Sequence, residues 1–430
     1  MSDSSEVNHG LTGRPKLGGR GSPRNLRSTN KCLLITTRRR RVVFLLVWLA
    51  TTLYAYEGLL FIRHCMNLKP APEFLLEDYG YYADAYNRWC MGENPYADQR
   101  IGTAFLYPPQ ALFLVALLEW CPSPETRFAL FVTVSLVLVA AMLLMLSQHT
   151  GVSVSSVPWV VPIAFGFGPL LFSTYMGQIN IIVAFFICVV IVQRKDHPFI
   201  AGVVLSAAIV IKLTPVFLLF LFADRWWKRS MSGVLVGIVC SSLATGFVYG
   251  WTVWPRYFEI LNVLTEAFPL GSGKYTMVNV FYLGFTSLGW DFSSVAPMVQ
   301  RAYVVIMVLL FSLATRLNCR SKTGDPLVAV LVFGMTILPN IVWYHHFVLF
   351  LPVIILLALR SPLTPGRAWR IVVLLAIVQC LPLLVPMNYG ALVLQGTVLL
   401  IIGMSVGEMW FRDPSSRASQ TTTSARSSCE

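Results

Sequence analysis

Residues 38–62 read RRRRVVFLLVWLATTLYAYEGLLFI, four arginines followed directly by the apolar run Val42–Ile62. A run of this length is sufficient to cross a bilayer as a helix. Because basic residues concentrate on the cytoplasmic side of membrane helices, the boundary predicts a span that starts from the cytoplasm. No small-residue cleavage site follows the run, so we expect the span to be retained rather than removed as a secretory signal.

The composition excludes a water-soluble domain. Of 430 residues, 56% are hydrophobic and 12% are charged, whereas soluble domains carry about 25% charged residues. Further apolar runs recur as far as Trp410, and they are continuous rather than alternating. The chain is therefore predicted to be an all-α polytopic membrane protein with about 12 membrane segments.

Charge and composition predict three regions. Residues 1–41 carry ten Lys or Arg against two acidic residues, and we expect a disordered, basic cytoplasmic tail there. Residues 42–410 form the predicted membrane domain, and the Ser/Thr-rich residues 411–430 a second disordered cytoplasmic tail. We expect a multi-pass protein of the plasma membrane and do not expect nucleic-acid binding.

The loops between apolar runs predict the orientation of the spans. Basic loops at residues 224–229, 316–322 and 360–370 are expected inside, and the mixed segment Trp251–Pro297 outside. In the first half an odd number of crossings is needed, so one apolar stretch must be short or re-entrant. We suspect Ala104–Trp120, because Tyr107-Pro108-Pro109 breaks its start. Lys212-Leu213-Thr214-Pro215 similarly predicts a hairpin of two half-helices.

The first outer loop gathers acidic residues. Residues 73–98 contain six of the 20 Asp and Glu in the chain, between the apolar runs Val42–Ile62 and Ala104–Trp120. Carboxylates are common groups for taking a proton from a hydroxyl. We therefore place the chemistry in this loop, on the extracytoplasmic side of the membrane.

Asp78 is the predicted catalytic residue. At helical spacing Asp78, Tyr82, Ala85 and Trp89 share one face, which predicts an amphipathic helix at the membrane interface. Near the start of that helix the dipole favours an ionised carboxylate, which can act as a general base. Alternatively, Asp78 only caps the helix. Gly92-Glu93-Asn94-Pro95 is expected to end it.

Polar residues inside apolar surroundings are the other candidates. Gln178 and Asn180, between two apolar runs, either bind sugar hydroxyls or satisfy a tight turn. Lys212 either pairs with a phosphate or extends to the inner interface as an anchor. His345 and His346 begin a late span on the outer side and could hold a lipid phosphate, or serve structure alone.

The cysteines predict no metal site. The nine Cys are scattered, with no C-x-x-C pair. Cys65 and Cys90 share the outer loop, where they either form a disulfide or stay apart as ordinary apolar residues.

A series of short motifs runs along the chain in a characteristic order. They are Asp78 with Tyr82 and Ala85, Gly92-x-Asn94-Pro95-Tyr96, Tyr107-Pro108-Pro109, Gly177-Gln178-x-Asn180, Lys212-Leu213-Thr214-Pro215 and Trp343-x-His345-His346. Over roughly residues 42–405 this order resembles glycosyltransferase family 87. The resemblance implies a GT-C fold and an enzyme that uses a polyprenyl-phosphate sugar, with mannose the sugar that the family favours and a pentose left open. It also implies a lipid or glycolipid acceptor.

The resemblance also implies roles for residues. Asp78 would deprotonate an acceptor hydroxyl, which would attack the anomeric carbon with inversion. His345 or His346 would hold the departing phosphate, with Lys212 second, and no metal or cofactor is implied. The family often has Asn-Gln-Ser in the later outer loop, where this chain has Asn279-Val280-Phe281, so acceptor or sugar recognition is expected to differ.

Two other classes of protein fit parts of the sequence. A transporter or lipid flippase would use Lys212 and Gln178 along a path through the membrane, but it leaves the large outer loops unexplained. A non-catalytic scaffold of the cell envelope would explain the tails but not the acidic loop. The carboxylates and the motif order favour the glycosyltransferase.

Overall fold

The computed structural model describes residues 76–98, 104–121, 123–154, 160–222, 227–266, 325–337 and 344–360, with parts of 282–318. Every regular element within these ranges is helical, which agrees with the predicted all-α class. The predicted span Val42–Ile62, the tails 1–41 and 411–430, Cys65 and Trp343 lie outside the described residues. The predicted Cys65–Cys90 pairing therefore stays a prediction, as do the limits of the three regions.

In the part of the chain that the structure describes, two helices are long and apolar enough to cross a membrane, by length and composition. They are α5 (Pro124–Thr150) and α10 (Trp227–Tyr249). Ser123 and Thr126 form a capping box at the start of α5, and Gly151 ends it in the left-handed conformation. The total of about 12 membrane segments stays a prediction.

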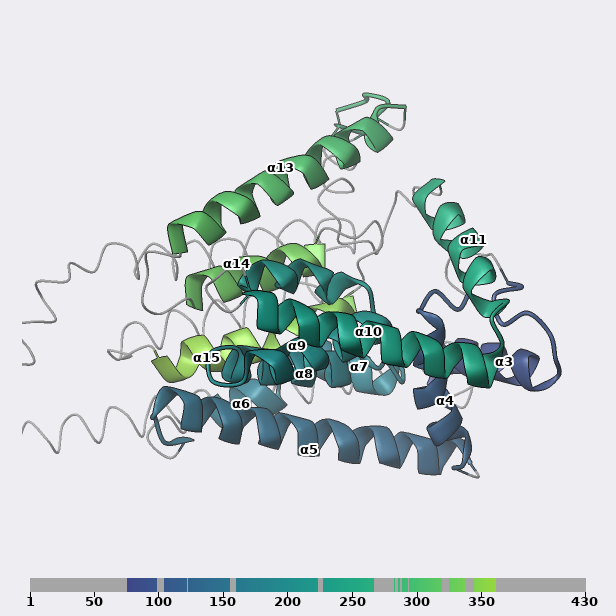
Figure 1. Ribbon diagram of the computed structural model, residues 1–430, viewed down its shortest axis with the longest axis horizontal. Coiled ribbons are helices and arrows are strands. Elements are labelled where there is room, and N and C mark those ends of the chain that lie inside the picture. The colour runs from purple at the N-terminus through teal and green to yellow at the C-terminus, as the bar shows by residue number, and fades with distance from the viewer. Residues whose placement is uncertain are drawn as a thin grey trace, which may run out of the picture.

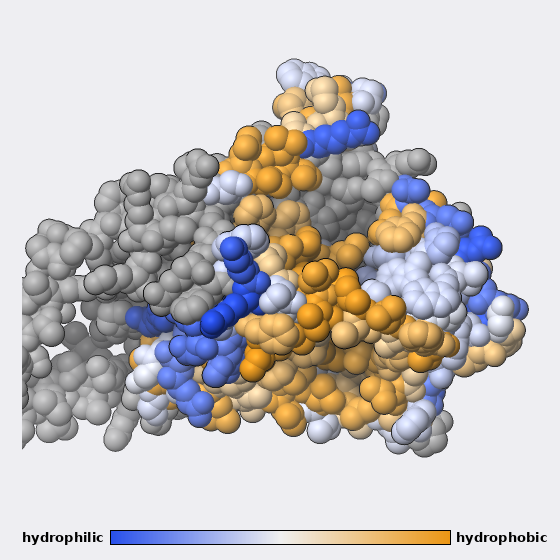
Figure 2. Space-filling model, viewed as in Figure 1, coloured by the Kyte–Doolittle hydropathy of each residue, from blue (hydrophilic) through white to orange (hydrophobic). Residues whose placement is uncertain are grey.

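The surface of α10 is apolar where it faces outward. Figure 2 shows a broad hydrophobic area over the middle of the molecule, between more polar regions at its two ends. The exposed apolar residues on α10 are Leu235, Val236, Val239, Leu243, Phe247 and Val248. Exposing a continuous apolar surface of this kind to water is unfavourable. The surface matches the side of a membrane helix that contacts lipid.

Apart from α13 (Ala296–Asn318), which has 23 residues like α10, the other described helices are shorter. They are α3 (Glu77–Cys90), η1 (Pro109–Ala111), α4 (Leu112–Glu119), α6 (Val160–Phe165), α7 (Gly168–Tyr175), α8 (Asn180–Gln193), α9 (Pro198–Ile211), η3 (Thr214–Phe222), α11 (Val253–Glu266), α14 (Asp325–Ile337), η4 (Tyr344–Phe350) and α15 (Leu351–Arg360). In Figure 1, α3, α4 and α11 gather at one end of the molecule, and α5 runs along one side.

The predicted short stretch is confirmed. In Ala104–Trp120 the only helical elements are η1 and the eight-residue α4, and a helix of eight residues rises only about 12 Å, far less than a bilayer. The apolar residues 160–176 do not form one helix but are divided into α6 and α7. The division has a local reason, because Pro169 in the first turn of α7 cannot donate to a preceding carbonyl.

The buried centre is built around α8 and α9. One face of α9 packs closely against α10, where a Cβ added at Gly233 would lie 2.2 Å from the carbonyl oxygen of Phe199. Only a residue without a side chain allows the two backbones to approach this far, as at other small-residue helix contacts in membranes. This packing holds the start of α9 in place, and the candidate site lies at the other end of that helix.

The predicted break at Lys212 is confirmed. α9 ends at Ile211, Lys212 has an extended backbone, and the 3₁₀ helix η3 begins at Thr214. Pro215 supplies no backbone donor, so the α-helical hydrogen-bond pattern cannot continue through it. The α-helix therefore ends directly before Lys212, one of the predicted site residues.

Candidate functional site

The start of α3 is attached to the end of α7. The Leu76 amide donates to the Tyr175 carbonyl at 3.1 Å, and the Tyr79 amide donates to the Met176 carbonyl at 3.3 Å. These bonds satisfy amides at the start of a helix that have no partner within it. Gly177 has a φ of +71°, and a Cβ there would lie 2.7 Å from Tyr79 Cβ. The turn after α7 therefore requires glycine, and α3 sits directly against it.

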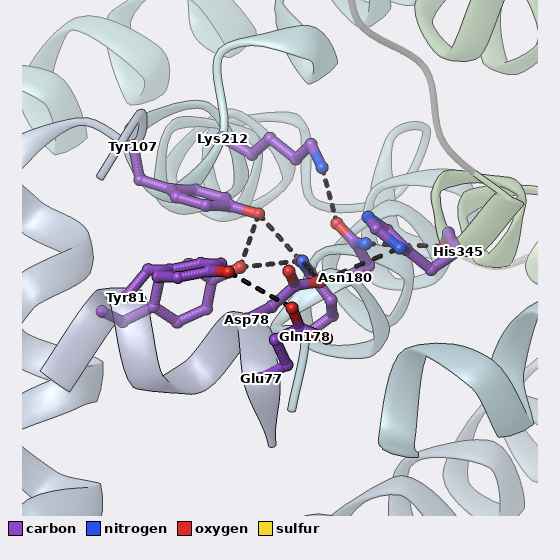
Figure 3. A network of polar contacts seen from close by, with 9 residues as sticks. Glu77, Asp78, Tyr81, Tyr107, Gln178, Asn180, Lys212 and His345 are labelled. Carbon is purple, nitrogen blue, oxygen red and sulfur yellow. Dashed lines mark hydrogen bonds and ion pairs between the residues drawn. The ribbon is translucent and has the colours of Figure 1, made fainter. Parts of the chain in front are cut away.

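This attachment brings Gln178 against Asp78. The Gln178 side-chain NH₂ donates to Asp78 Oδ2, while its Oε1 accepts from the Tyr82 hydroxyl at 2.8 Å and from the Tyr107 hydroxyl at 2.8 Å. The two tyrosine hydroxyls lie 3.0 Å apart. With two donors on its oxygen, the amide must direct its NH₂ group toward the carboxylate. Figure 3 shows this network.

The carboxyl group of Asp78 is tuned by its surroundings. Its side chain is 16% exposed. Burial raises its pKa to about 6; the Gln178 hydrogen bond opposes that rise, Glu77 adds to it, and Lys212 lowers it. A carboxyl group with this pKa is mostly ionised at pH 7 and still basic enough to accept a proton, which suits a general base.

His345 stands on the other side of the carboxylate. Its Nδ1 lies 4.0 Å from Asp78 Oδ2, within ion-pair distance if the ring is protonated. The ring is stacked on Phe172 with a centroid distance of 6.1 Å, and the His346 ring stands perpendicular to it at 4.6 Å. Of the two histidines, His345 is therefore the one that faces Asp78 (Figure 3).

Lys212 closes the network from the end of α9. Its ammonium group donates to Asn180 Oδ1 at 2.7 Å and lies over the Tyr107 ring, 5.5 Å from the centroid. Asn180, the first residue of α8, donates from Nδ2 to the His345 carbonyl at 3.5 Å. The cation is buried, and its partners are an amide oxygen and an aromatic face rather than a carboxylate at contact distance. An anion entering here would therefore find a desolvated positive charge.

The structure brings together residues that were predicted from four separate parts of the sequence. Those that take part in the network directly are Asp78, Tyr82, Gln178, Asn180, Lys212 and His345, and His346 lies against His345. Trp343, from the last motif, lies outside the described residues. The predicted helix around Asp78 is confirmed as α3, and Gly92, with a φ of +78°, lies just past its end.

Tyr107 is a site residue that sequence reasoning did not recognise. The Tyr107-Pro108-Pro109 motif signals a helix start, and η1 does begin at Pro109. Its hydroxyl nevertheless donates to Gln178, and its carbonyl accepts from the Tyr96 hydroxyl at 2.9 Å. A residue directly before proline is restricted toward an extended backbone, so Pro108 limits the conformations open to Tyr107, and this is the one local signal that its position is fixed.

A second set of contacts, among Tyr79, Glu119 and Arg127, also holds α3 in place. The Tyr79 hydroxyl donates to Glu119 Oε1 at 2.6 Å, and Arg127 Nη2 lies 3.0 Å from Glu119 Oε2. The Arg127 guanidinium also stands 5.6 Å from the centre of the Tyr79 ring. These contacts hold α3 against the end of α4 and the start of α5. The first turn of α3, which carries Asp78, is therefore fixed both by these contacts and by its hydrogen bonds to the end of α7.

The arrangement combines a base with sites for an anion. Asp78 can accept a proton, Lys212 and His345 can stabilise negative charge, and the amides of Gln178 and Asn180 can orient hydroxyls. Among the described residues no group of three or more His, Cys, Asp or Glu could hold a metal ion. A set of groups of this kind can serve transfer between a hydroxyl and a phosphate-bearing substrate.

Comparison with known proteins agrees with this chemistry. The model of glycosyltransferase family 87 matches residues 105–339, more than half of the chain. The chain belongs to glycosyltransferase family 87. The predicted class of enzyme, a glycosyltransferase, is thereby confirmed. Asp78, Tyr82, His345 and His346 fall outside the matched residues, so their roles depend on the geometry described above.

Two curated relatives resemble this member of family 87. A protein of Mycolicibacterium smegmatis is 26% identical over 303 residues, covering 64% of this chain and 67% of the relative. One of Mycobacterium tuberculosis is 26% identical over 275 residues, covering 59% of this chain and 62% of the relative. Each is named a polyprenol-phosphate-mannose-dependent alpha-(1-2)-phosphatidylinositol mannoside mannosyltransferase. No solved structure matches the chain.

Proposed function

We propose that this family 87 enzyme moves a sugar, mannose, from a polyprenyl-phosphate donor to a lipid or glycolipid acceptor on the extracytoplasmic face of the membrane. The observation that carries the proposal is the meeting of the Asp78 carboxylate, His345 and the Gln178 amide, from three distant parts of the chain. The names of the two mycobacterial relatives support the donor and the sugar. The basic loops on the other side of the predicted spans support the face.

In the proposed reaction Asp78 acts as the general base. The acceptor hydroxyl gives its proton to the Asp78 carboxylate as its oxygen attacks the anomeric carbon of the donor. The bond between that carbon and the phosphate oxygen breaks at the same time, and the phosphate leaves with the electron pair. Attack from the face opposite the leaving phosphate inverts the configuration at the anomeric carbon.

The departing phosphate gains negative charge, which Lys212 and His345 would stabilise. Lys212 is a buried cation whose nearest partners are Asn180 and the Tyr107 ring, so a phosphate would supply an anionic partner that none of these provides. His345 Nδ1 lies 4.0 Å from Asp78 Oδ2, so its ring can contact a substrate that binds beside that carboxylate. Charge-assisted bonds to groups already in place stabilise the leaving group without reorganisation.

Gln178, which donates a hydrogen bond to the Asp78 carboxylate, has a positioning role in this proposal. Its amide is held by the Tyr82 and Tyr107 hydroxyls, and it holds the carboxylate in turn. A base that is fixed in this way does not need to be reoriented when substrate arrives. A transporter reading finds less support, since the same polar residues bond to one another across the site and the family is one of transferases.

The test is transfer by membranes that carry Asp78→Asn. Asparagine keeps the shape but cannot accept the proton, so we expect transfer of labelled mannose from polyprenyl phosphate to fall by about 10²- to 10⁴-fold. Asp196→Asn is the matched control, because Asp196 is exposed in the loop after α8, at the other end of that helix from Asn180. Full activity in Asp78→Asn membranes would refute the assignment of the base.

A further inference from the structure

A cavity lies beside α3, next to the network around Asp78. It has a volume of about 120 Å³; α3 supplies Tyr81, Asp84 and Arg88 to its wall, and the segment after α3 supplies Asp98 and Phe105. One water molecule needs roughly 10–15 Å³ of such space. The cavity therefore accepts a group much larger than a water molecule, and none of these five residues belongs to the network around Asp78.

The chemistry of the wall selects the kind of ligand. The carboxylates of Asp84 and Asp98 accept hydrogen bonds from hydroxyls, and the Arg88 guanidinium donates them. The rings of Tyr81 and Phe105 offer apolar surfaces against which the C–H groups of a sugar or polyol ring can pack. Asp84 and Asp98 are two of the three charged side chains in the described wall, and carboxylates disfavour a phosphate and favour a neutral ring rich in hydroxyls.

The cavity adjoins the catalytic network. The Phe105 ring contacts the rings of Tyr82 and Tyr107 at centroid distances of 6.1 Å and 5.9 Å, so one residue borders both places. The Tyr81 hydroxyl donates to Glu77 at 3.3 Å, which brings this part of the wall back to the turn that carries Asp78. Tyr81 lies three residues after Asp78, a rise of about 4.5 Å along the helix.

We propose that this cavity binds a hydroxyl-rich ring of the acceptor headgroup and so presents an acceptor hydroxyl to Asp78. The inference rests on the proposed function. The transferred sugar of the donor is a second source of the same chemistry. The acceptor is favoured because the donor phosphate is assigned to Lys212, which is not among the residues that line the cavity.

The test measures initial rates against each substrate separately, in membranes that carry the full chain with Asp84→Asn, Asp98→Asn or both. Loss of a hydrogen-bonding charge in the cavity is expected to raise KM for the acceptor about 10-fold, with kcat within about 3-fold and KM for the donor unchanged. Glu93→Gln is the matched control, because Glu93 is exposed just after α3 and does not line the cavity. The control should leave both KM values unchanged.

Two results would overturn the inference while wild-type transfer stands: a rise in KM for the donor alone, or no change in either KM in the double variant. If the wild type transfers no sugar, the proposed function fails and the cavity is tested by binding. Ligand-observed NMR with methyl α-D-mannopyranoside should then give a signal with the purified wild type and with Asp78→Asn, and not with the double variant. A signal of equal size in the double variant, or none in the wild type, overturns the inference.

Discussion

Replacing Gln178 by methionine should move the pH dependence of the enzyme toward alkaline pH. Methionine has a similar length but cannot donate the hydrogen bond that Gln178 gives to Asp78 Oδ2. That bond is one of the influences that hold the Asp78 pKa down, against the larger effect of burial. The 3.0 Å bond between the Tyr82 and Tyr107 hydroxyls can persist, so the aromatic part of the network keeps one of its contacts.

The size of the shift follows from the energy of a hydrogen bond to a charged group. Such a bond contributes about 1.5–3 kcal/mol, and one pKa unit corresponds to about 1.36 kcal/mol. The Asp78 pKa, about 6 in the wild type, should therefore rise by about one to two units in the variant. At pH 7 the ionised fraction would fall from about nine-tenths to between about one-half and one-tenth.

The assay is kcat/KM for transfer of labelled mannose, measured between pH 5 and pH 9 at constant ionic strength. A general base must be ionised, so wild-type activity should fall tenfold per unit as the pH drops below about 6. In Gln178→Met the same decline should begin between about pH 7 and pH 8, and activity should recover at higher pH.

The matched control is Gln110→Met, the same change in another buried amide. Gln110 donates to Ser242 on α10 at 3.4 Å and does not contact Asp78. Gln110→Met should leave unchanged the pH below which kcat/KM declines, even if the total activity falls. If Gln178→Met instead loses the same factor at every pH and its decline still begins near pH 6, Gln178 does not tune the base and the reasoning is wrong.

Two further changes test the phosphate site and the attachment of α3. Lys212→Met should raise KM for the polyprenyl-phosphate donor by about 10-fold or more, because a charge-assisted bond is lost, while KM for the acceptor stays the same; an unchanged donor KM would remove Lys212 from the site. Gly177→Ala should lower the free energy of unfolding by about 1–3 kcal/mol in detergent, because its φ is +71° and the new Cβ meets Tyr79. Gly80→Ala on α3, where a Cβ meets nothing within 4 Å, should be neutral or slightly stabilising. An equal loss of unfolding free energy in both variants would argue against the packing of α3 on the turn at Gly177.

Several features of the fold follow directly from local sequence. Apolar length alone predicts α5 and α10, because a helix that crosses hydrocarbon must be long and apolar throughout. Spacing predicts α3, and proline predicts the break after Ile211. Between residues 160 and 176 apolar composition alone does not reveal the division into α6 and α7, although Pro169 marks it locally.

The sequence by itself therefore determined the class of protein, the helix that carries Asp78 and most of the polar residues of the site, because these depend on composition, periodicity and motif order. Only the tertiary structure decided which of them meet. It selected His345 over His346, added Tyr107, and joined Gln178 to Asp78 across 100 positions of sequence. The physical reason is that a hydrogen bond or ion pair depends on distance and direction in space, and the packing of α3 against the turn at Gly177 sets both.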